Sequence, residues 1–165
     1  MLTPGTPGNW TASVSAEGTH SISCSVSDND GNSASDDDTV KIDTKAPSVS
    51  GCSVTPSKLR TSANNHKLVT VTATAPTVTD SGGSGPNGLT LFSVTSSQAD
   101  SGLGPDDVPN DIQGWTTGTN PADTGGQLRA ERYGGARTYT LTHRGTDLAG
   151  NTAECKPTVT VPKGG

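Results

Sequence analysis

Polar and apolar residues alternate strictly in several short stretches of the chain, which is the pattern of a half-buried β-strand. The clearest stretches are Leu68–Ala75 and Thr158–Val161. Glycine and proline interrupt the segments between such runs, and no window carries the 3.6-residue period of an amphipathic helix. The pattern therefore predicts an all-β protein built as a β-sandwich.

The alternation places the expected strands in two groups. In the second part of the chain we expect strands at Ser48–Val54, Lys67–Ala75, Leu89–Ser96, Gln113–Thr116, Gln127–Tyr133, Arg137–Thr146 and Thr158–Val161. In the first part we expect strands at Trp10–Val14, Thr19–Ser27 and Thr39–Asp43, with Asp36–Asp38 at the crest of an acidic hairpin.

An internal repeat explains this division into two lobes. Residues 19–42 align without a gap with residues 138–161 at a constant offset of 119 positions, the separation of Asp28 and Asp147. Such a repeat indicates one supersecondary unit used twice. We therefore expect a partial domain at 1–46, which holds only the C-terminal strands, and a complete domain at 47–165. Three strands bury little, which leaves room for strand completion of the first lobe by another segment or chain.

A register argument applies to the two strands around residues 128 and 141. If they form a hairpin, Leu128 lies opposite Leu141 and Ala130 lies opposite Tyr139, so that all four share one face. A slip by one residue would expose half of this set. In the preferred register Arg129 and Glu131 point outward.

Composition and charge narrow the function classes. Only 28% of the residues are hydrophobic and 3% aromatic, so the core must be thin. The net charge of −5 argues against a nucleic-acid partner. A group of arginines is interleaved with acidic residues, and we interpret it as a solvated, internally paired face. Its members are Arg129, Arg132, Arg137 and Arg144.

Two further absences concern the membrane and the chain start. No apolar run approaches the roughly 20 residues that span a bilayer, so we expect no membrane insertion. Met1 is followed at once by a linker-like stretch of proline, glycine and threonine instead of a signal peptide. We therefore expect Met1 to be a start placed within a longer exported chain.

The closing strands carry a family resemblance. The stretch Tyr139–Cys155 with Val159–Val161 resembles the end of hyalin-repeat and related bacterial immunoglobulin-like domains, and Lys41–Pro47 resembles a junction between such modules. The second lobe is similar to a C-terminal immunoglobulin-like module of large exported bacterial proteins. The shared residues are Asn65–Lys67, Val94–Ser97, Gly102–Gly104, Asp107, Asp111, Leu128–Arg132, Arg137 and Tyr139.

The resemblance implies an immunoglobulin-like β-sandwich in an extracellular, secreted or cell-surface protein, with no catalytic residues to carry over. Tyr139 takes the place of the tyrosine corner of that fold. The chain departs from the module's pattern in its acidic loop. Gly104–Asp107 replaces the sequence Gly-Asp-Gly-Asp, and Ala99 replaces a glutamate.

The three cysteines form an odd set. Cys52 lies on the first strand of the second lobe and Cys155 just before its last strand. The resemblance implies a disulfide between them, because those strands are neighbours in an immunoglobulin-like sandwich; the alternative is three free thiols. Closing a loop of about a hundred residues would contribute roughly 4–5 kcal/mol. Cys24 has no expected partner within the chain.

Acidic residues form two candidate calcium sites, because calcium prefers six to eight oxygen ligands. The first comprises Asp100, Asp106, Asp107 and Asp111 in one long loop, joined by Glu131 or Asp80. Its alternative is a solvated polar loop. The second comprises Asp28–Gly31 with Asp36–Asp38, and it does not match the EF-hand spacing.

Nothing in the sequence indicates an enzyme. The three histidines lack zinc-ligand spacing, and no Gly-x-Ser-x-Gly elbow or phosphate loop appears. We expect a non-catalytic module for adhesion to an extracellular protein or polysaccharide, or a structural spacer. The alternative is an accessory, carbohydrate- or polymer-binding module of a secreted hydrolase, for which Trp115 is the candidate for stacking on a sugar.

Overall fold

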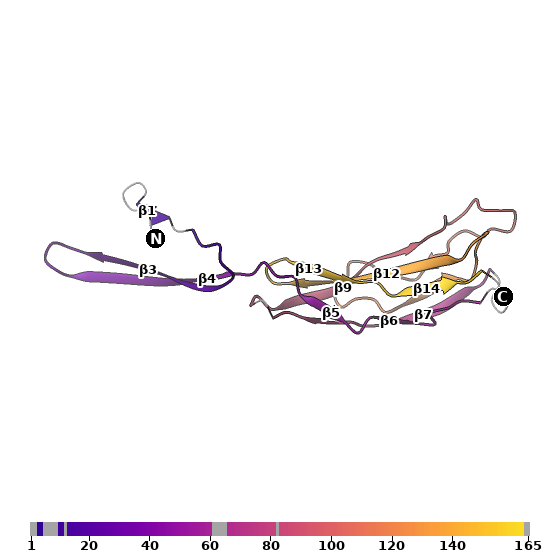
Figure 1. The fold of residues 1–165 in the computed structure, drawn as a ribbon, viewed down its shortest axis with the longest axis horizontal. Helices are drawn as coiled ribbons and strands as arrows, with labels where there is room; N and C mark the ends of the chain where they lie inside the picture. Colours follow the sequence, from indigo (N-terminus) through magenta and orange to yellow (C-terminus); the bar gives the residue numbers. More distant parts are fainter. Residues whose placement is uncertain (1–2, 5–9, 12, 61–65, 82, 164–165) are drawn as a thin grey trace.

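The regular structure of the chain is entirely β, as the alternation predicted. The computed structural model describes residues 3–4, 10–11, 13–60, 66–81 and 83–163. Figure 1 shows an elongated molecule, with a two-stranded hairpin at one end and a two-layered β structure at the other. Within these residues there is no helix that could cross a membrane.

The strands follow the two predicted groups. The first lobe contains β1 (Thr3–Pro4), β2 (Trp10–Thr11), β3 (Gly18–Ser27) and β4 (Ser33–Ile42). The second lobe contains β5 (Ser48–Ser50), β6 (Ser53–Thr55), β7 (Leu68–Thr74), β8 (Thr77–Thr79), β9 (Pro86–Ser96), β10 (Ile112–Gln113), β11 (Gly125–Arg129), β12 (Arg137–Asp147), β13 (Thr152–Cys155) and β14 (Thr158–Val161).

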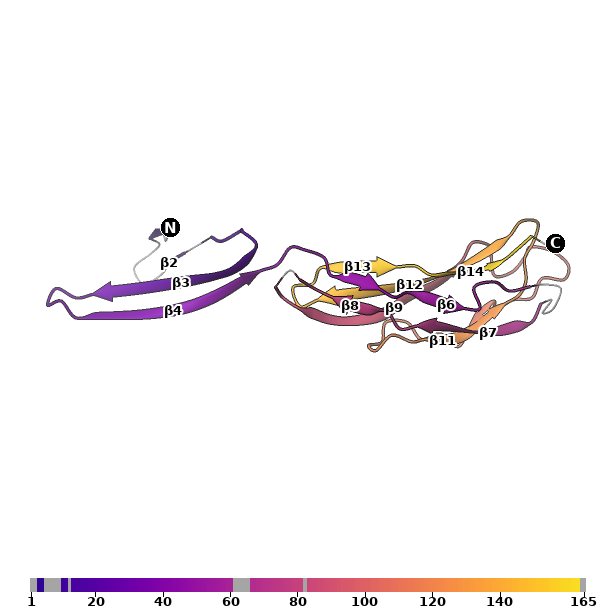
Figure 2. The same ribbon diagram turned by 60° about the horizontal axis from the view of Figure 1, so that its bottom comes forward.

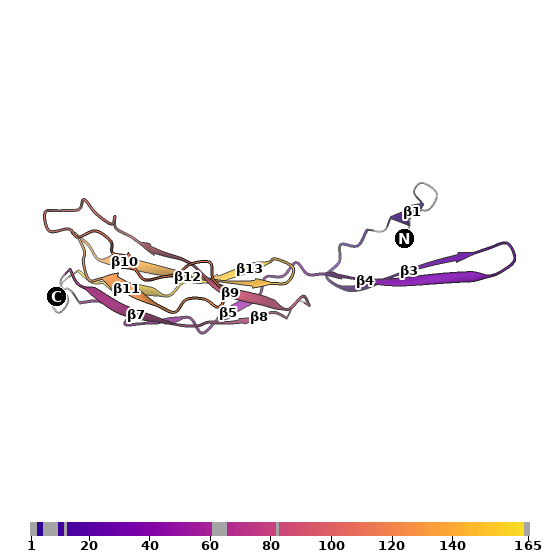
Figure 3. The same ribbon diagram turned by 180° about the vertical axis from the view of Figure 1, so that it is seen from behind.

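Two antiparallel sheets make up most of the second lobe. One has the order β10–β11–β7–β6, and it is seen from behind in Figure 3. The other is centred on β12, which pairs with β9 along its length and with β13 and then β14. Both sheets contribute side chains to one core, an arrangement consistent with a β-sandwich (Figure 2). The buried core comprises Val54, Leu59, Val71, Ala73, Leu91, Leu128, Ala130, Tyr139, Leu141, Val159 and Val161.

The expected first strand of this lobe is divided in two. Gly51 has a φ of 78°, a left-handed conformation that glycine adopts readily. The chain bends there, and β5 pairs with β8 while β6 pairs with β7. The expected single strand Ser48–Val54 therefore contacts two different partners.

The predicted hairpin between Leu128 and Leu141 is wrong. Leu128 lies opposite Val69 of β7, and Leu141 lies opposite Val94 of β9, so the two leucines belong to different sheets. Both are nevertheless fully buried in the same core. Alternation correctly assigned them to one interior, but it carries no information on whether two strands are neighbours in a sheet or face each other across the core.

The outward orientation predicted for Arg129 and Glu131 is also wrong. Their exposed fractions are 7% and 4%. Arg137, expected on a solvated face, is fully buried. These charged groups are inside because the long loop that precedes β10 covers them, as the contacts described below show.

The internal repeat is confirmed as a structural repeat. Every cross-strand pair of β12 with β13 and β14 corresponds, at the offset of 119, to a pair of β3 with β4. For example, His20 lies opposite Val40, as Tyr139 lies opposite Val159. The first-lobe hairpin is thus built in the same register as the closing strands of the second lobe.

The same turn closes both hairpins. The backbone N–H of Asn32 donates to Oδ1 of Asp28, and that of Asn151 donates to Oδ1 of Asp147, each at 2.8 Å. The glycine before each asparagine has a positive φ, 89° and 92°. The hairpin crest is therefore at Asp28–Asn32. The expectation of a crest at Asp36–Asp38 is wrong, because these residues lie within β4.

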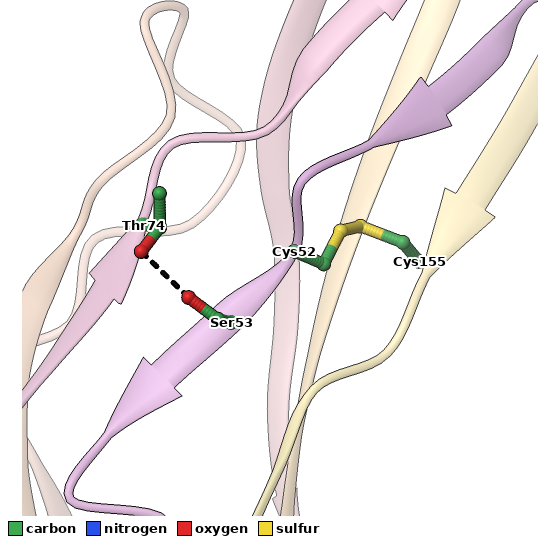
Figure 4. The surroundings of a disulfide bond; sticks show 4 residues. All are labelled: Cys52, Ser53, Thr74 and Cys155. Atoms are coloured by element: carbon green, nitrogen blue, oxygen red, sulfur yellow. Dashed lines mark hydrogen bonds between the residues drawn. A yellow bond between two sulfur atoms is a disulfide. The ribbon is translucent and has the colours of Figure 1, made fainter.

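The disulfide between Cys52 and Cys155 is confirmed (Figure 4). Its Cα atoms lie 6.3 Å apart, and it joins the bend between β5 and β6 to the end of β13. Beside it, the hydroxyl groups of Ser53 and Thr74 lie 2.7 Å apart and link β6 to β7. Cys24 is a free, exposed thiol on β3.

The bridge closes a long stretch of chain, with 103 residues of sequence separation. We expect reduction, or the substitution Cys155→Ser, to lower the free energy of unfolding by roughly 4–5 kcal/mol, because the unfolded chain regains loop entropy. Urea denaturation with and without reductant measures the loss. In the oxidised protein, alkylation followed by peptide mapping should modify Cys24 alone. Recovery of alkylated Cys52 would contradict the assignment.

Candidate functional site

A buried ion pair organises the end of the second lobe that carries the long acidic loop. The carboxylate of Asp111, the last residue of that loop before β10, accepts a hydrogen bond from Nη1 of Arg137 on β12. Both side chains are almost completely buried. Burial raises the pKa of Asp111, and the charge of Arg137 opposes this rise.

A second arginine, Arg129 on β11, also lies beside Asp111. Nε of Arg129 lies 3.2 Å from Oδ1 of Asp111, although without the geometry of a hydrogen bond. Its terminal nitrogens donate to the backbone carbonyls of His66, at 2.8 Å, and Pro109, at 2.9 Å. Asp111 is therefore held between two guanidinium groups.

Tyr139 ties this pair to the backbone of the neighbouring sheet. Its hydroxyl donates to the carbonyl oxygen of Arg129 at 2.8 Å and accepts from Nη1 of Arg137 at 3.1 Å. Burial raises the pKa of Tyr139 to about 12, so the hydroxyl stays protonated and remains a donor. The arrangement can fix a long loop in place, but it presents no open position to a ligand.

The loop itself is ordered by its own carboxylates. Asp100 accepts hydrogen bonds from the backbone N–H groups of Asn110, at 3.0 Å, and Asp111, at 2.7 Å. Asp107 accepts from the N–H of Leu103 at 2.9 Å. The neighbouring side chain of Glu131 and the N–H of Leu103 lower the pKa of Asp107. These acids act mainly as caps for backbone donors.

A shallow cavity opens where this loop meets β11. It has a volume of about 200 Å³. Nδ1 of His66 lies 2.8 Å from Oε2 of Glu131. Tyr133, which is 60% exposed, packs its ring against Gly104, where a Cβ atom would lie only 2.8 Å from the ring. The lining residues are His66, Leu103, Gly104, Pro105, Asp106, Asp107, Glu131, Arg132 and Tyr133.

The expected calcium ligands of the loop are therefore only partly brought together. Asp106, Asp107 and Glu131 line the cavity, whereas Asp111 is engaged by arginines and Asp100 caps the backbone. Among the described residues, the loop carboxylates do not form a group of three within ligand distance. This donor set does not fit a calcium site as it stands, and metal binding by the loop stays a prediction.

The second expected acidic site is dispersed as well. Asp28 is engaged in the turn that it closes, where hydrogen bonds with Asn32 lower its pKa. Asp37 accepts from Ser23 on one face of the hairpin, and the alternation of β4 directs Asp36 and Asp38 to the other face. In the described part of the chain these carboxylates form no ligand group.

Three carboxylates that the sequence did not associate meet at the junction between the lobes. The ligand atoms of Asp43, Asp80 and Asp147 all lie within 4.8 Å of one another, close enough to contact one cation. Their oxygens also accept hydrogen bonds from protein groups. Asp43 accepts from Ser84, Asp80 accepts from the N–H of Gly85 at 2.8 Å, and the Asp147 side chain closes its turn.

The junction is held from both lobes. Nδ2 of Asn151 in the second lobe donates to the carbonyl oxygen of Asp43 at 3.0 Å. From the first lobe, Oε2 of Glu17 accepts from the N–H of Thr44 at 3.0 Å and from its hydroxyl at 2.7 Å. The linker between the lobes is thus bound on both sides. The spacing of these residues in sequence gave no indication of their association.

The aromatic residues differ from the expectation for Trp115. Its ring is partly buried against the core and lies on Gly126, which leaves room for it because it has no Cβ. The more exposed rings are Tyr133 and Phe92, the latter 48% exposed. The guanidinium of Arg144 covers Phe92 at 3.3 Å from the ring centre. Tyr133 is therefore the exposed aromatic side chain that lines a cavity.

No family model, no curated protein and no solved structure matches the chain.

The buried ion pair generates a prediction about stability. Removing one partner leaves an uncompensated buried charge, so Asp111→Ala and Arg137→Ala should each lower the free energy of unfolding by about 3–5 kcal/mol. The double variant should lose less than the sum of the two, because both members of the pair are removed together and only Arg129 is left without its carboxylate neighbour. Urea denaturation of all four proteins measures this coupling.

A matched control lies on the surface of the same strand. Nη2 of Arg144 and Oε1 of Glu154 form an exposed ion pair at 2.7 Å. The same cycle with Arg144→Ala and Glu154→Ala should give at most about 1 kcal/mol per substitution. Equal losses in the two cycles would show that the buried pair has no special structural role.

Proposed function

We propose that the chain is a non-catalytic, extracellular module with an immunoglobulin-like β-sandwich, and that it acts as a structural spacer or adhesion module of an exported protein. The immunoglobulin-like assignment is supported by the hydrogen bond from Tyr139 to the carbonyl of Arg129, which has the form of a tyrosine corner. The disulfide supports an oxidising, extracellular compartment. The negative net charge supports a protein or polysaccharide partner over nucleic acid.

The observation that carries the spacer function is the junction between the lobes. A flexible linker would allow the lobes to move independently, but here Asp43 and Thr44 are bound from both sides. The hairpin extends away from the sandwich along the length of the molecule (Figure 1). A bound linker of this kind holds successive modules at a set angle, which is the mechanical requirement for a spacer.

We further propose a calcium site at this junction, distinct from the one expected in the long loop. The cluster of Asp43, Asp80 and Asp147 brings three negative charges together, and like charges at such distances repel. A divalent cation would relieve this repulsion and link residues of both lobes. Calcium would then act by stiffening the junction.

Spin labels on the two lobes test the spacer function. With Cys24→Ser as background, labels on Ser35→Cys and Asn87→Cys should give one narrow distance distribution by electron–electron double resonance. The double substitution Asn151→Ala with Ser84→Ala should broaden it, because Asp43 then loses the two hydrogen bonds that it accepts from side chains of the second lobe. Asn32→Ala is the matched control, since Asn32 occupies the equivalent turn at the far end of the hairpin.

Two outcomes decide the proposal. A distance distribution that is already broad in the parent protein would end the spacer function.

Repeating the measurement in calcium and in chelator tests the metal. Calcium should narrow the distance distribution and raise the melting temperature, and Asp80→Asn should remove both effects. Identical results with calcium and chelator would end the calcium prediction but leave the spacer function intact.

A second candidate is an accessory module that binds a polysaccharide for a secreted hydrolase. The observation in its favour is the cavity beside Tyr133, where an exposed aromatic ring lies next to the carboxylates of Asp107 and Glu131. A ring face and hydrogen-bond acceptors together can hold a sugar. In this candidate Tyr133 takes the role that the sequence suggested for Trp115.

Binding to soluble polysaccharides distinguishes this candidate. Affinity electrophoresis should show retardation of the parent protein, and Tyr133→Ala should remove it. Phe92→Ala, which removes an exposed ring outside the cavity, should leave the retardation unchanged. Lack of retardation by any glycan in a panel of neutral and acidic glycans would reject the candidate.

A further inference from the structure

The hairpin of the first lobe leaves one long strand edge unpaired. Among the described residues, β3 pairs with β4 and with no other strand, although it is ten residues long. Ile22, Cys24 and Val26 alternate along β3 and form an apolar series. Val26 is 67% exposed. The edge carries no Asp, Glu, Lys or Arg from Gly18 to Ser27. Such an edge is a template for another strand.

The other edge of the hairpin differs. The central part of β4 contains three consecutive aspartates, Asp36–Asp38, and a lysine follows at Lys41. Charged residues on an edge strand oppose pairing, because an added strand would have to be placed against them. Strand addition to the hairpin is therefore directed to β3.

The second lobe shows which kind of strand fits this edge. The equivalent edge of β12 pairs with β9 along its length. In that pairing Leu141 lies opposite Val94, His143 opposite Leu91 and Gly145 opposite Leu89. A strand bound to β3 as β9 is bound to β12 would, at the offset of 119, form the pairs Ile22–Val94, Cys24–Leu91 and Val26–Leu89. The aliphatic side chains of the bound strand would then lie beside the apolar residues of β3.

One difference between the lobes favours a strand that pairs along the edge of β3 over strands that pack on the face of the hairpin, as β5 and β8 pack in the second lobe. In the second lobe, β5 and β8 approach Gly145 so closely that a Cβ atom there would lie 2.8 Å from Val49 and 2.9 Å from Val78. Val26 occupies the equivalent position in the first lobe. Its side chain would clash with strands placed as β5 and β8 are, whereas pairing along the edge of β3 requires no such approach.

We propose that the edge of β3 is a binding site for an uncharged antiparallel strand of the β9 type, supplied by a separate polypeptide. The bound strand adds to the hairpin through backbone hydrogen bonds and places its aliphatic side chains beside Ile22, Cys24 and Val26. This mode of recognition is β-strand addition. It is independent of the spacer function, because Ile22, Cys24 and Val26 are not among the residues that bind the linker.

A synthetic peptide with the sequence of Pro86–Ser96 is the probe. Titrated onto the full chain labelled with ¹⁵N, it should shift and protect the amide signals of Gly18–Ser27, with little change in β12. A peptide with Leu91→Lys should bind at least about tenfold more weakly, because it loses the burial of one leucine side chain. Phe92→Lys is the matched control, since Phe92 points to the other face of β9.

The register gives a second, covalent readout. A peptide with Leu91→Cys should form a mixed disulfide with Cys24 under mild oxidation, because the two residues are predicted to lie opposite each other. A peptide with Phe92→Cys should react much more slowly. The exchange releases two electrons and two protons to an added oxidant such as oxidised glutathione.

Several outcomes would overturn the proposal. Shifted signals in β12 instead of β3 would show exchange of the peptide with the native β9. A failure to bind at millimolar concentration, or equal crosslinking by both cysteine peptides, would show that β3 accepts no strand in this register. Association of the chain with itself in the absence of peptide, through the same amides, would identify a second copy as the partner.

Discussion

The carboxylate of Asp111 is the constraint on which the functional end of the second lobe depends. A buried carboxylate must be compensated, and here Arg137 on β12 and Arg129 on β11 supply the compensation from opposite sheets. The same arginines donate to the backbone of the loop before Asp111 and of His66. One ion pair therefore joins both sheets to the long loop, and it brings the wall of the cavity into position beside Tyr133.

The repeat shows how one backbone unit behaves in two environments. In the second lobe its central strand is paired on both edges and its inner face is buried, whereas among the described residues of the first lobe only one edge is paired. The turn and the register are identical because they depend on local residues, namely an aspartate, a glycine and an asparagine. The burial of its side chains depends on the strands that pack against the repeated hairpin, and a hairpin alone buries little surface.

The junction links these two environments. The turn that closes the second copy of the unit also binds the linker, through Asn151 and the carbonyl of Asp43. Asp147 closes that turn and belongs to the group of carboxylates at the junction. The turn at Asp147–Asn151 therefore closes its own hairpin and also binds the linker at Asp43, which is distant in sequence. This connection is the basis of the proposed spacer.

The amino-acid sequence by itself determined the strand content, the repeat with its offset and the position of most strands. These features follow from short-range patterns: side-chain alternation, glycine at a positive φ, and spacing. The disulfide between Cys52 and Cys155 also followed, through the resemblance to immunoglobulin-like modules. Only the tertiary structure decided that Leu128 and Leu141 belong to different sheets of one core, because a period of two identifies a face and not a neighbour. It alone decided the partner of Asp111 and the meeting of Asp43, Asp80 and Asp147, since charges distant in sequence become partners only when the fold brings them together.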